Sequence, residues 1–117
     1  MRMRKKPNLI PRMERCAEEL IREPEEQRGR WRTLMPQAEE LRLELGCGKG
    51  RFTAETAASN PQALFIAVER VPDAMVIAME RVCAMGFKNV FVVDRDASAL
   101  SSYFTPGYDM RFAVAFI

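Results

Sequence analysis

The residues best suited to chemistry form a glycine-rich segment that directly follows a short apolar stretch. Residues 41–50 read Leu-Arg-Leu-Glu-Leu-Gly-Cys-Gly-Lys-Gly, with glycines at positions 46, 48 and 50. Glycines at this spacing let backbone N–H groups approach a ligand without obstruction from a Cβ atom. Residues 51–60 are predicted to form a helix, and its positive N-terminal end would face the same ligand. The sequence therefore predicts a binding loop between a strand and a helix.

The spacing of these glycines excludes two common nucleotide-binding motifs. A G-x-G-x-x-G dinucleotide motif requires a glycine where Arg51 stands, which disfavours a nucleotide-dependent oxidoreductase. A phosphate-binding loop requires Ser or Thr after its lysine, and Lys49 is followed by Gly50. A glycine-rich turn in an ordinary α/β protein remains the alternative.

The elements that must position this loop alternate between strands and helices. An amphipathic helix is expected from Met13 to Arg22, closed by Pro24, and a charged connector with Trp31 and Leu34 as anchors follows it. Trp31 could stack on a base, but packing onto the core is the commoner role. From residue 41, strands are predicted at 41–45, 64–69, 90–93 and 110–117, and helices at 51–60, 72–85 and 97–103. This order predicts an α/β fold with a right-handed, doubly wound parallel sheet.

Three acidic residues fall at the carboxyl ends of successive predicted strands, where open α/β sheets bind ligands. They are Glu44, Glu69 and Asp96. Glu69 lies about twenty residues beyond the glycines, the spacing at which an acid accepts hydrogen bonds from ribose hydroxyls. Asp96 could accept from the exocyclic amine of adenine, or could instead be the N-cap of the helix beginning at Ala97. Three such acids around one glycine loop favour a nucleoside-containing cofactor.

Composition narrows the class of chemistry. The chain has no histidine, and its three cysteines are far apart with no C-x-x-C pair. We therefore expect no zinc site, no Ser-His-Asp triad and no other metal site. Reduced thiols and the lack of an export signal predict a cytoplasmic protein. No apolar run approaches the roughly 18 residues that would span a membrane.

Positive charge is concentrated at the N-terminus. Residues 1–32 hold ten basic and six acidic residues, whereas the remainder holds eight basic and ten acidic residues. The first six residues alone contain Arg2, Arg4, Lys5 and Lys6. A basic arm of this kind suits contacts with nucleic-acid phosphates, and a solvated terminus is the alternative.

The motifs together resemble a known family. The E-x-G-x-G-x-G pattern from Glu44 to Gly50 resembles the first motif of class I S-adenosylmethionine-dependent methyltransferases, which have a Rossmann-like fold. The basic opening, the Gly-Lys-Gly-Arg-Phe extension at 48–52, Val-Glu-Arg at 68–70 and Asp-Ala at 96–97 resemble bacterial tRNA (guanine-N(7)-)-methyltransferases more specifically. Nearly the whole chain up to about Pro106 takes part in this resemblance.

The resemblance implies a cofactor, a substrate and a set of contacts. S-adenosylmethionine would bind through Glu44, Gly46, Gly48, Gly50, Glu69, Asp96 and Ala97. The RNA-binding residues would be Arg2, Arg4, Lys5 and Lys6, and the partner would be tRNA. Residues 1–36 are expected to form the arm, helix and connector, and residues 37–117 the N-terminal part of the methyltransferase domain. The oligomeric state is left open.

Guanine N7 has an exposed lone pair and needs no base to remove a proton, which agrees with the absence of histidine. Alignment, proximity and exclusion of water would then carry the reaction. Lys49, Arg51 and Arg70 could balance phosphates or the cofactor carboxylate, or could simply be solvated. The family's Asp-Pro-Trp-Pro motif, with its functional aspartate, is expected beyond Ile117, so the fold would be incomplete at its C-terminus. The alternative function is therefore a catalytically inactive, truncated remnant that binds cofactor or RNA.

Overall fold

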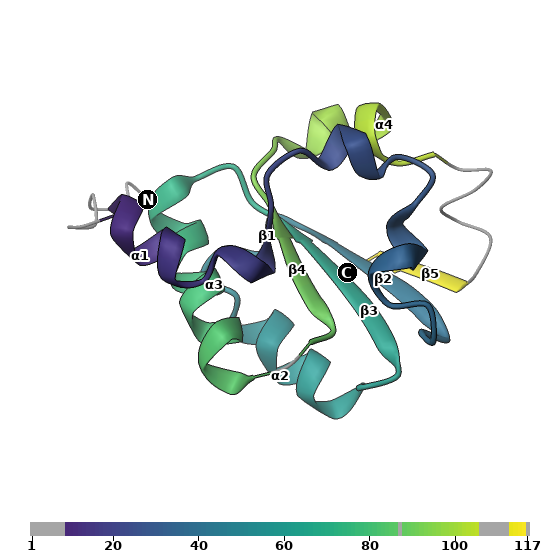
Figure 1. Ribbon diagram of the computed structural model, residues 1–117, viewed down its shortest axis with the longest axis horizontal. Helices are drawn as coiled ribbons and strands as arrows, with labels where there is room; N and C mark the ends of the chain where they lie inside the picture. The colour runs from purple at the N-terminus through teal and green to yellow at the C-terminus, as the bar shows by residue number, and fades with distance from the viewer. Residues whose placement is uncertain (1–8, 87, 106–112, 117) are drawn as a thin grey trace.

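A five-stranded parallel sheet forms the centre of the molecule (Figure 1). The computed structural model describes residues 9–86, 88–105 and 113–116. The strands are β1 (Leu20–Ile21), β2 (Glu40–Leu45), β3 (Ala63–Val68), β4 (Val90–Val93) and β5 (Ala113–Phe116). Their order across the sheet is β1-β4-β3-β2-β5, and every neighbouring pair is parallel. The predicted parallel α/β architecture is confirmed.

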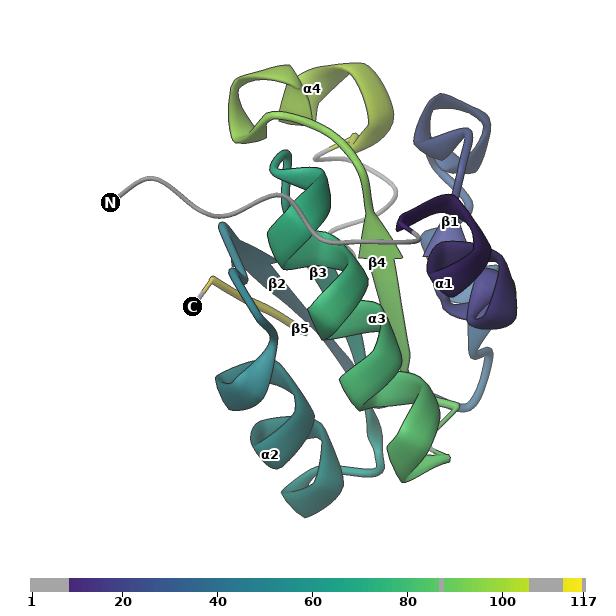
Figure 2. The ribbon, with the colours of Figure 1, turned by 90° about the vertical axis from the view of Figure 1, so that its left-hand side faces the viewer.

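Helices cover both faces of this sheet. On one face lie α2 (Arg51–Ser59) and α3 (Pro72–Met85), with α1 (Leu9–Arg15) beside α3 (Figure 2). On the other lie the short α4 (Leu100–Tyr103) and the 3₁₀ turn η3 (Trp31–Leu34). The remaining 3₁₀ turns are η1 (Ala17–Glu19), η2 (Pro24–Gln27) and η4 (Ala97–Ala99).

The continuous apolar run of β3 explains why both faces are covered. All six of its residues are buried, and successive side chains point to opposite faces of a sheet. Leu64, Ile66 and Val68 pack in a core with Trp31 and Tyr103. Ala63 and Phe65 pack on the opposite side with Ala57 of α2 and Val82 of α3, joined by Val90 of β4.

The packing role predicted for Trp31 is confirmed. Its side chain is completely buried, and its Nε1–H donates to the Tyr103 carbonyl at 2.7 Å. The two rings meet edge to face with centroids 6.3 Å apart. Because the indole N–H and both faces of the ring are enclosed, Trp31 is not placed to stack on a base.

The expectation of a single helix through residues 13–22 is wrong. The α-helix ends at Arg15, a 3₁₀ turn follows, and Leu20 and Ile21 form a strand paired with Val92 and Val93 of β4. Helical periodicity reflects only the local spacing of apolar residues. The backbone N–H and C=O groups at the edge of β4 need hydrogen-bond partners, and a strand at Leu20–Ile21 can supply them whereas a helix cannot. The N-terminal segment thereby extends the sheet.

The last predicted strand is observed over part of its length. Ala113–Phe116 pairs in parallel with β2, from Glu40 opposite Ala113 to Leu43 opposite Phe116. The rest of the predicted range, residues 110–112 and 117, lies outside the described residues. In the described sheet β5 forms one edge and β1 the other.

Candidate cofactor-binding site

The glycine loop begins where β2 leaves the sheet. Gly46 N and Cys47 N both donate to the carbonyl of Val68, the last residue of β3, at 2.8 and 3.1 Å. Gly46, Gly48 and Gly50 then adopt positive φ angles of 77°, 58° and 75°. Three left-handed residues within five positions turn the chain from the strand into α2, a path that residues with a Cβ rarely follow.

The three glycines serve two different purposes. A Cβ atom built on Gly46 or Gly48 would meet no atom within 4 Å, so these positions face open space. A Cβ on Gly50 would lie 2.7 Å from Ala78 Cβ and 2.9 Å from Ala78 Cα. The first two glycines therefore border room for a ligand, whereas Gly50 lets α2 begin in direct contact with α3.

Glu69 ties the loop to the end of β3. Its side chain is 8% exposed, and its Oε1 accepts from Gly48 N at 2.8 Å. Its other oxygen, Oε2, accepts from Arg70 N at 3.1 Å and from Val71 N at 3.0 Å. A buried carboxylate needs hydrogen-bond donors, and here the donors are backbone N–H groups. One side chain thus orders both the middle of the glycine loop and the turn that leads into α3.

Glu44 lies beneath the loop on the face covered by α2. Its side chain is buried, and its Oε2 accepts a hydrogen bond from the Thr53 hydroxyl. Burial raises the pKa of Glu44, and the Thr53 hydrogen bond opposes that rise. Because the charged form is held at a cost, a polar group or positive charge arriving at the loop would stabilise this carboxylate.

Cys47 is buried in the glycine loop, near enough to Glu44 and Glu69 for their charges to act on its thiol. Burial, followed by the negative charges of Glu44 and Glu69, raises the pKa of its thiol to about 12. A thiol with such a pKa is protonated at neutral pH and is a poor nucleophile. Cys47 packs with Ala67 of β3 and Ala78 of α3.

Asp96 and Ala97 lie beyond the end of β4. Asp96 is exposed, and its Oδ1 accepts from Ser98 N at 2.9 Å, so it acts as the predicted N-cap of the turn that begins at Ala97. Its other oxygen lies 3.7 Å from Arg70 Nε, which links it to the residue that follows Glu69. The backbone hydrogen bond from Ser98 lowers the pKa of Asp96.

The strand ends bring the predicted acids into one row. Glu44 is the penultimate residue of β2, Glu69 directly follows β3, and Asp96 lies three residues beyond β4. These three strands are neighbours in the sheet, and the loop lies against the ends of β2 and β3. The predicted basic residues Arg2, Arg4, Lys5 and Lys6 lie outside the described residues. Two other basic residues are candidate partners for phosphates or the cofactor carboxylate. Arg51 pairs with Glu55 at 3.3 Å along α2, and Lys49 is exposed.

Sequence reasoning missed two contacts in this site. It did not identify Thr53 as the partner of Glu44, or the loop itself as the partner of Glu69. The only signal for Thr53 is a polar residue on the buried side of α2, next to Ala54 and Ala57. The contact between Gly48 and Glu69 has no sequence signal, because its donor is a backbone N–H group.

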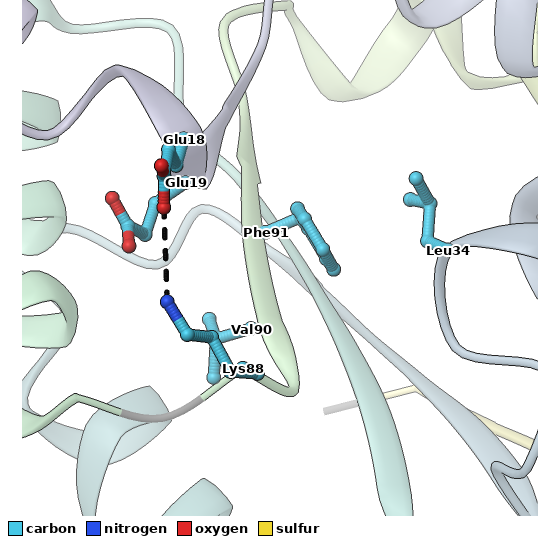
Figure 3. Close-up of a pocket in the computed structure, with 6 residues that line it drawn as sticks. All are labelled: Glu18, Glu19, Leu34, Lys88, Val90 and Phe91. Carbon is cyan, nitrogen blue, oxygen red and sulfur yellow. Dashed lines mark ion pairs between the residues drawn. The ribbon is translucent and has the colours of Figure 1, made fainter.

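A separate cavity of about 240 Å³ lies at the opposite, amino end of β4 (Figure 3). Its lining includes Lys88, Val90, Phe91 and Leu34, and an ion pair of 3.7 Å between Lys88 and Glu18 crosses it. This cavity is distinct from the glycine loop. Within the described part of the chain, no helix has both the length and the apolar character needed to cross a membrane.

The chain is similar in sequence to a methyltransferase family and to several named relatives. Residues 38–116 match the sequence model of a family described as "Putative methyltransferase". A curated relative from Geobacillus kaustophilus, named tRNA (guanine-N(7)-)-methyltransferase, is 34% identical over 99% of this chain and 54% of its own length. Relatives of the same name from Bacillus cytotoxicus and Acetivibrio thermocellus are 33% and 42% identical, covering 92% and 70% of this chain. The chain spans about half the length of the first two relatives.

Proposed function

Because this chain belongs to the putative methyltransferase family, we propose that it binds S-adenosylmethionine at the glycine loop and methylates guanine N7 in tRNA. The observation that carries the proposal is the loop itself. Gly46 and Gly48 face open space, and the buried acids Glu44 and Glu69 stand beside them. The names of the relatives supply the substrate.

The loop fits the proposed cofactor on chemical grounds. The positions that a Cβ would occupy at Gly46 and Gly48 are free, so a ligand can reach the backbone there. We propose that Glu69 accepts from the ribose hydroxyls, that Asp96 and Ala97 contact the adenine, and that Glu44 lies beside the methionine part. Gly50 would act indirectly, by holding α2 against α3.

The chain's own contribution to methyl transfer would be alignment and exclusion of water. S-adenosylmethionine, when bound, supplies an electrophilic methyl group on a positively charged sulfur. Guanine N7 offers a lone pair, so no residue of this chain has to remove a proton. The protonated Cys47 thiol, with its pKa raised to about 12, leaves the loop without a competing nucleophile. A cytoplasmic location is proposed with this function.

The test of the function uses the 117-residue chain, S-adenosylmethionine with a labelled methyl group, and unmodified tRNA. We expect label on guanine N7, mapped by chemical cleavage at 7-methylguanosine. A matched tRNA transcript containing 7-deazaguanine has carbon in place of N7 and should accept no label. Equal labelling of both transcripts, or no labelling of either, would contradict the proposed reaction.

The predicted basic arm gives a separate expectation for tRNA binding. Each phosphate neutralised by Arg2, Arg4, Lys5 or Lys6 releases counterions, so affinity should fall steeply with salt. Deleting residues 1–6 should flatten the plot of log affinity against log salt by up to about 3, the effect of roughly four lost contacts. Fluorescence anisotropy with labelled tRNA measures this slope.

The control for the arm is Lys88→Gln, which removes one exposed positive charge at the amino end of β4. Its slope should stay close to that of the wild type. An unchanged slope after the deletion would show that the arm is a solvated terminus.

A further inference from the structure

Two cysteines and a glutamate that are far apart in sequence meet on the face of the sheet covered by α3. Cys16 follows α1, Glu19 ends η1, and Cys83 lies in the last turn of α3. The two Sγ atoms and a Glu19 carboxylate oxygen all lie within 4.8 Å of one another. From these three residues we propose a binding site for a thiophilic divalent cation of the Zn²⁺ class, separate from the glycine loop.

The local backbone directs the first two ligands to the same side. Glu19 N donates to Cys16 O at 3.2 Å, which closes a 3₁₀ turn. Side chains three positions apart eclipse in such a turn, so Cys16 and Glu19 project together. Cys83 faces them from α3, on the same helical stripe as Met75 and Met79.

The burial of the acidic residue Glu19 beside an apolar cluster is not explained by core packing alone. Its side chain is only 9% exposed, and it belongs to the described residues, among which we find no hydrogen bond or ion pair to its carboxylate. Figure 3 shows that the neighbouring Glu18 pairs with Lys88, whereas the Glu19 carboxylate points away from Phe91. The carboxylate therefore remains available as an oxygen ligand beside the two thiols.

The donor set and its size suit Zn²⁺. Thiolate and carboxylate ligands bind this ion at about 2.3 and 2.0–2.2 Å, so neighbouring ligand atoms in a tetrahedral site are about 3.5–3.8 Å apart. Because the three atoms lie within 4.8 Å of one another, the site would have to contract by at most about 1 Å, which small side-chain rotations can supply. Both thiols would release their protons on binding, and a water molecule would complete the four ligands.

The surroundings leave the three residues available. Glu80, the other acid near Cys16, is held by Arg12 through bonds of 3.0 and 2.5 Å, so it is not a free fourth ligand. Glu19 also lines the cavity of about 240 Å³, which gives an ion a route from solvent. Because β1 begins directly after Glu19, a bound cation would fasten the N-terminal segment to α3.

The test uses the reduced 117-residue chain and Co²⁺, a spectroscopic substitute for Zn²⁺. We expect one Co²⁺ per chain with a thiolate-to-cobalt charge-transfer band, displaced by Zn²⁺. Cys16→Ser and Cys83→Ser should each weaken the band and the affinity, and Glu19→Gln should weaken affinity on the order of tenfold or more. Zn²⁺ should also raise the melting temperature of the wild type and leave that of Cys83→Ser unchanged.

Two matched variants separate this site from non-specific binding. Glu18→Gln removes the neighbouring exposed acid, and Cys47→Ala removes the third cysteine, so neither should alter the Co²⁺ stoichiometry or the band. Circular dichroism establishes that each variant is folded. Absence of the band in the wild type, or its persistence in folded Cys16→Ser and Cys83→Ser, would overturn the proposal. A disulfide between Cys16 and Cys83 in a chain that takes up no Zn²⁺ would make the pair a redox site instead.

Discussion

Replacing Gly50 with alanine should lower the free energy of unfolding by about 2–5 kcal/mol. The new Cβ would lie 2.7 Å from Ala78 Cβ and 2.9 Å from Ala78 Cα, and the second of these atoms belongs to the backbone of α3. Forcing extra volume into a packed contact costs about 1–3 kcal/mol. The φ of +75° adds about 1–2 kcal/mol for any residue with a Cβ. Urea denaturation followed by circular dichroism measures the change.

Gly86→Ala is the matched control for this clash. Gly86 ends α3 with a φ of +71°, nearly that of Gly50, but a Cβ there would meet nothing within 4 Å. It should therefore cost only the conformational part, about 1–2 kcal/mol. If the two variants lost equal stability, the contact between the glycine loop and α3 would not have the importance assigned to it.

The second large effect is expected for Glu69→Ala, which should weaken S-adenosylmethionine binding on the order of tenfold or more. The carboxylate is proposed to hold the ribose, and loss of a charge-assisted hydrogen bond costs roughly 1.5–3 kcal/mol. The same substitution also frees Gly48 N, Arg70 N and Val71 N, so part of the loss would come from a less ordered loop. Isothermal titration calorimetry on the folded variant measures the affinity.

Glu39→Ala provides the comparison for Glu69. Glu39 is an exposed acid just before β2, at the end of the sheet opposite the glycine loop. It changes the net charge of the chain by the same amount and should leave the affinity near that of the wild type. Equal weakening by both substitutions would indicate a long-range charge effect and argue against contact between Glu69 and the cofactor.

The parts of the fold with discrete local signals could be predicted closely. Pro72 and Gly86 mark the two ends of α3, and the helix runs from Pro72 to Met85 as expected, because one residue suits a first turn and the other a left-handed cap. The N-terminal segment carried only a weak periodic signal. There the pairing of Leu20 with Val92, 72 residues away, decided the structure, and no local pattern contains that information.

In the candidate site, too, some features follow from the sequence pattern and others depend on packing between distant elements. Its acids could be located because parallel strands bring their carboxyl ends to one edge of a sheet. The bond from Thr53 to Glu44 and the bond from Gly48 to Glu69 arise from packing between elements. The cluster of Cys16, Glu19 and Cys83 was missed for a similar reason: the expectation of no metal site relied on local C-x-x-C spacing and histidine, whereas Cys83 comes from a distant helix.

The central claim is that the glycine loop and the acids beside it recognise S-adenosylmethionine. Calorimetric titration of the wild-type chain with S-adenosylmethionine and, in a parallel experiment, with NAD tests it most directly. The claim predicts binding of one S-adenosylmethionine per chain with clear preference over NAD, since Arg51 stands where a dinucleotide motif requires glycine. Preferential binding of NAD would contradict it, as would the absence of any S-adenosylmethionine binding by the folded chain.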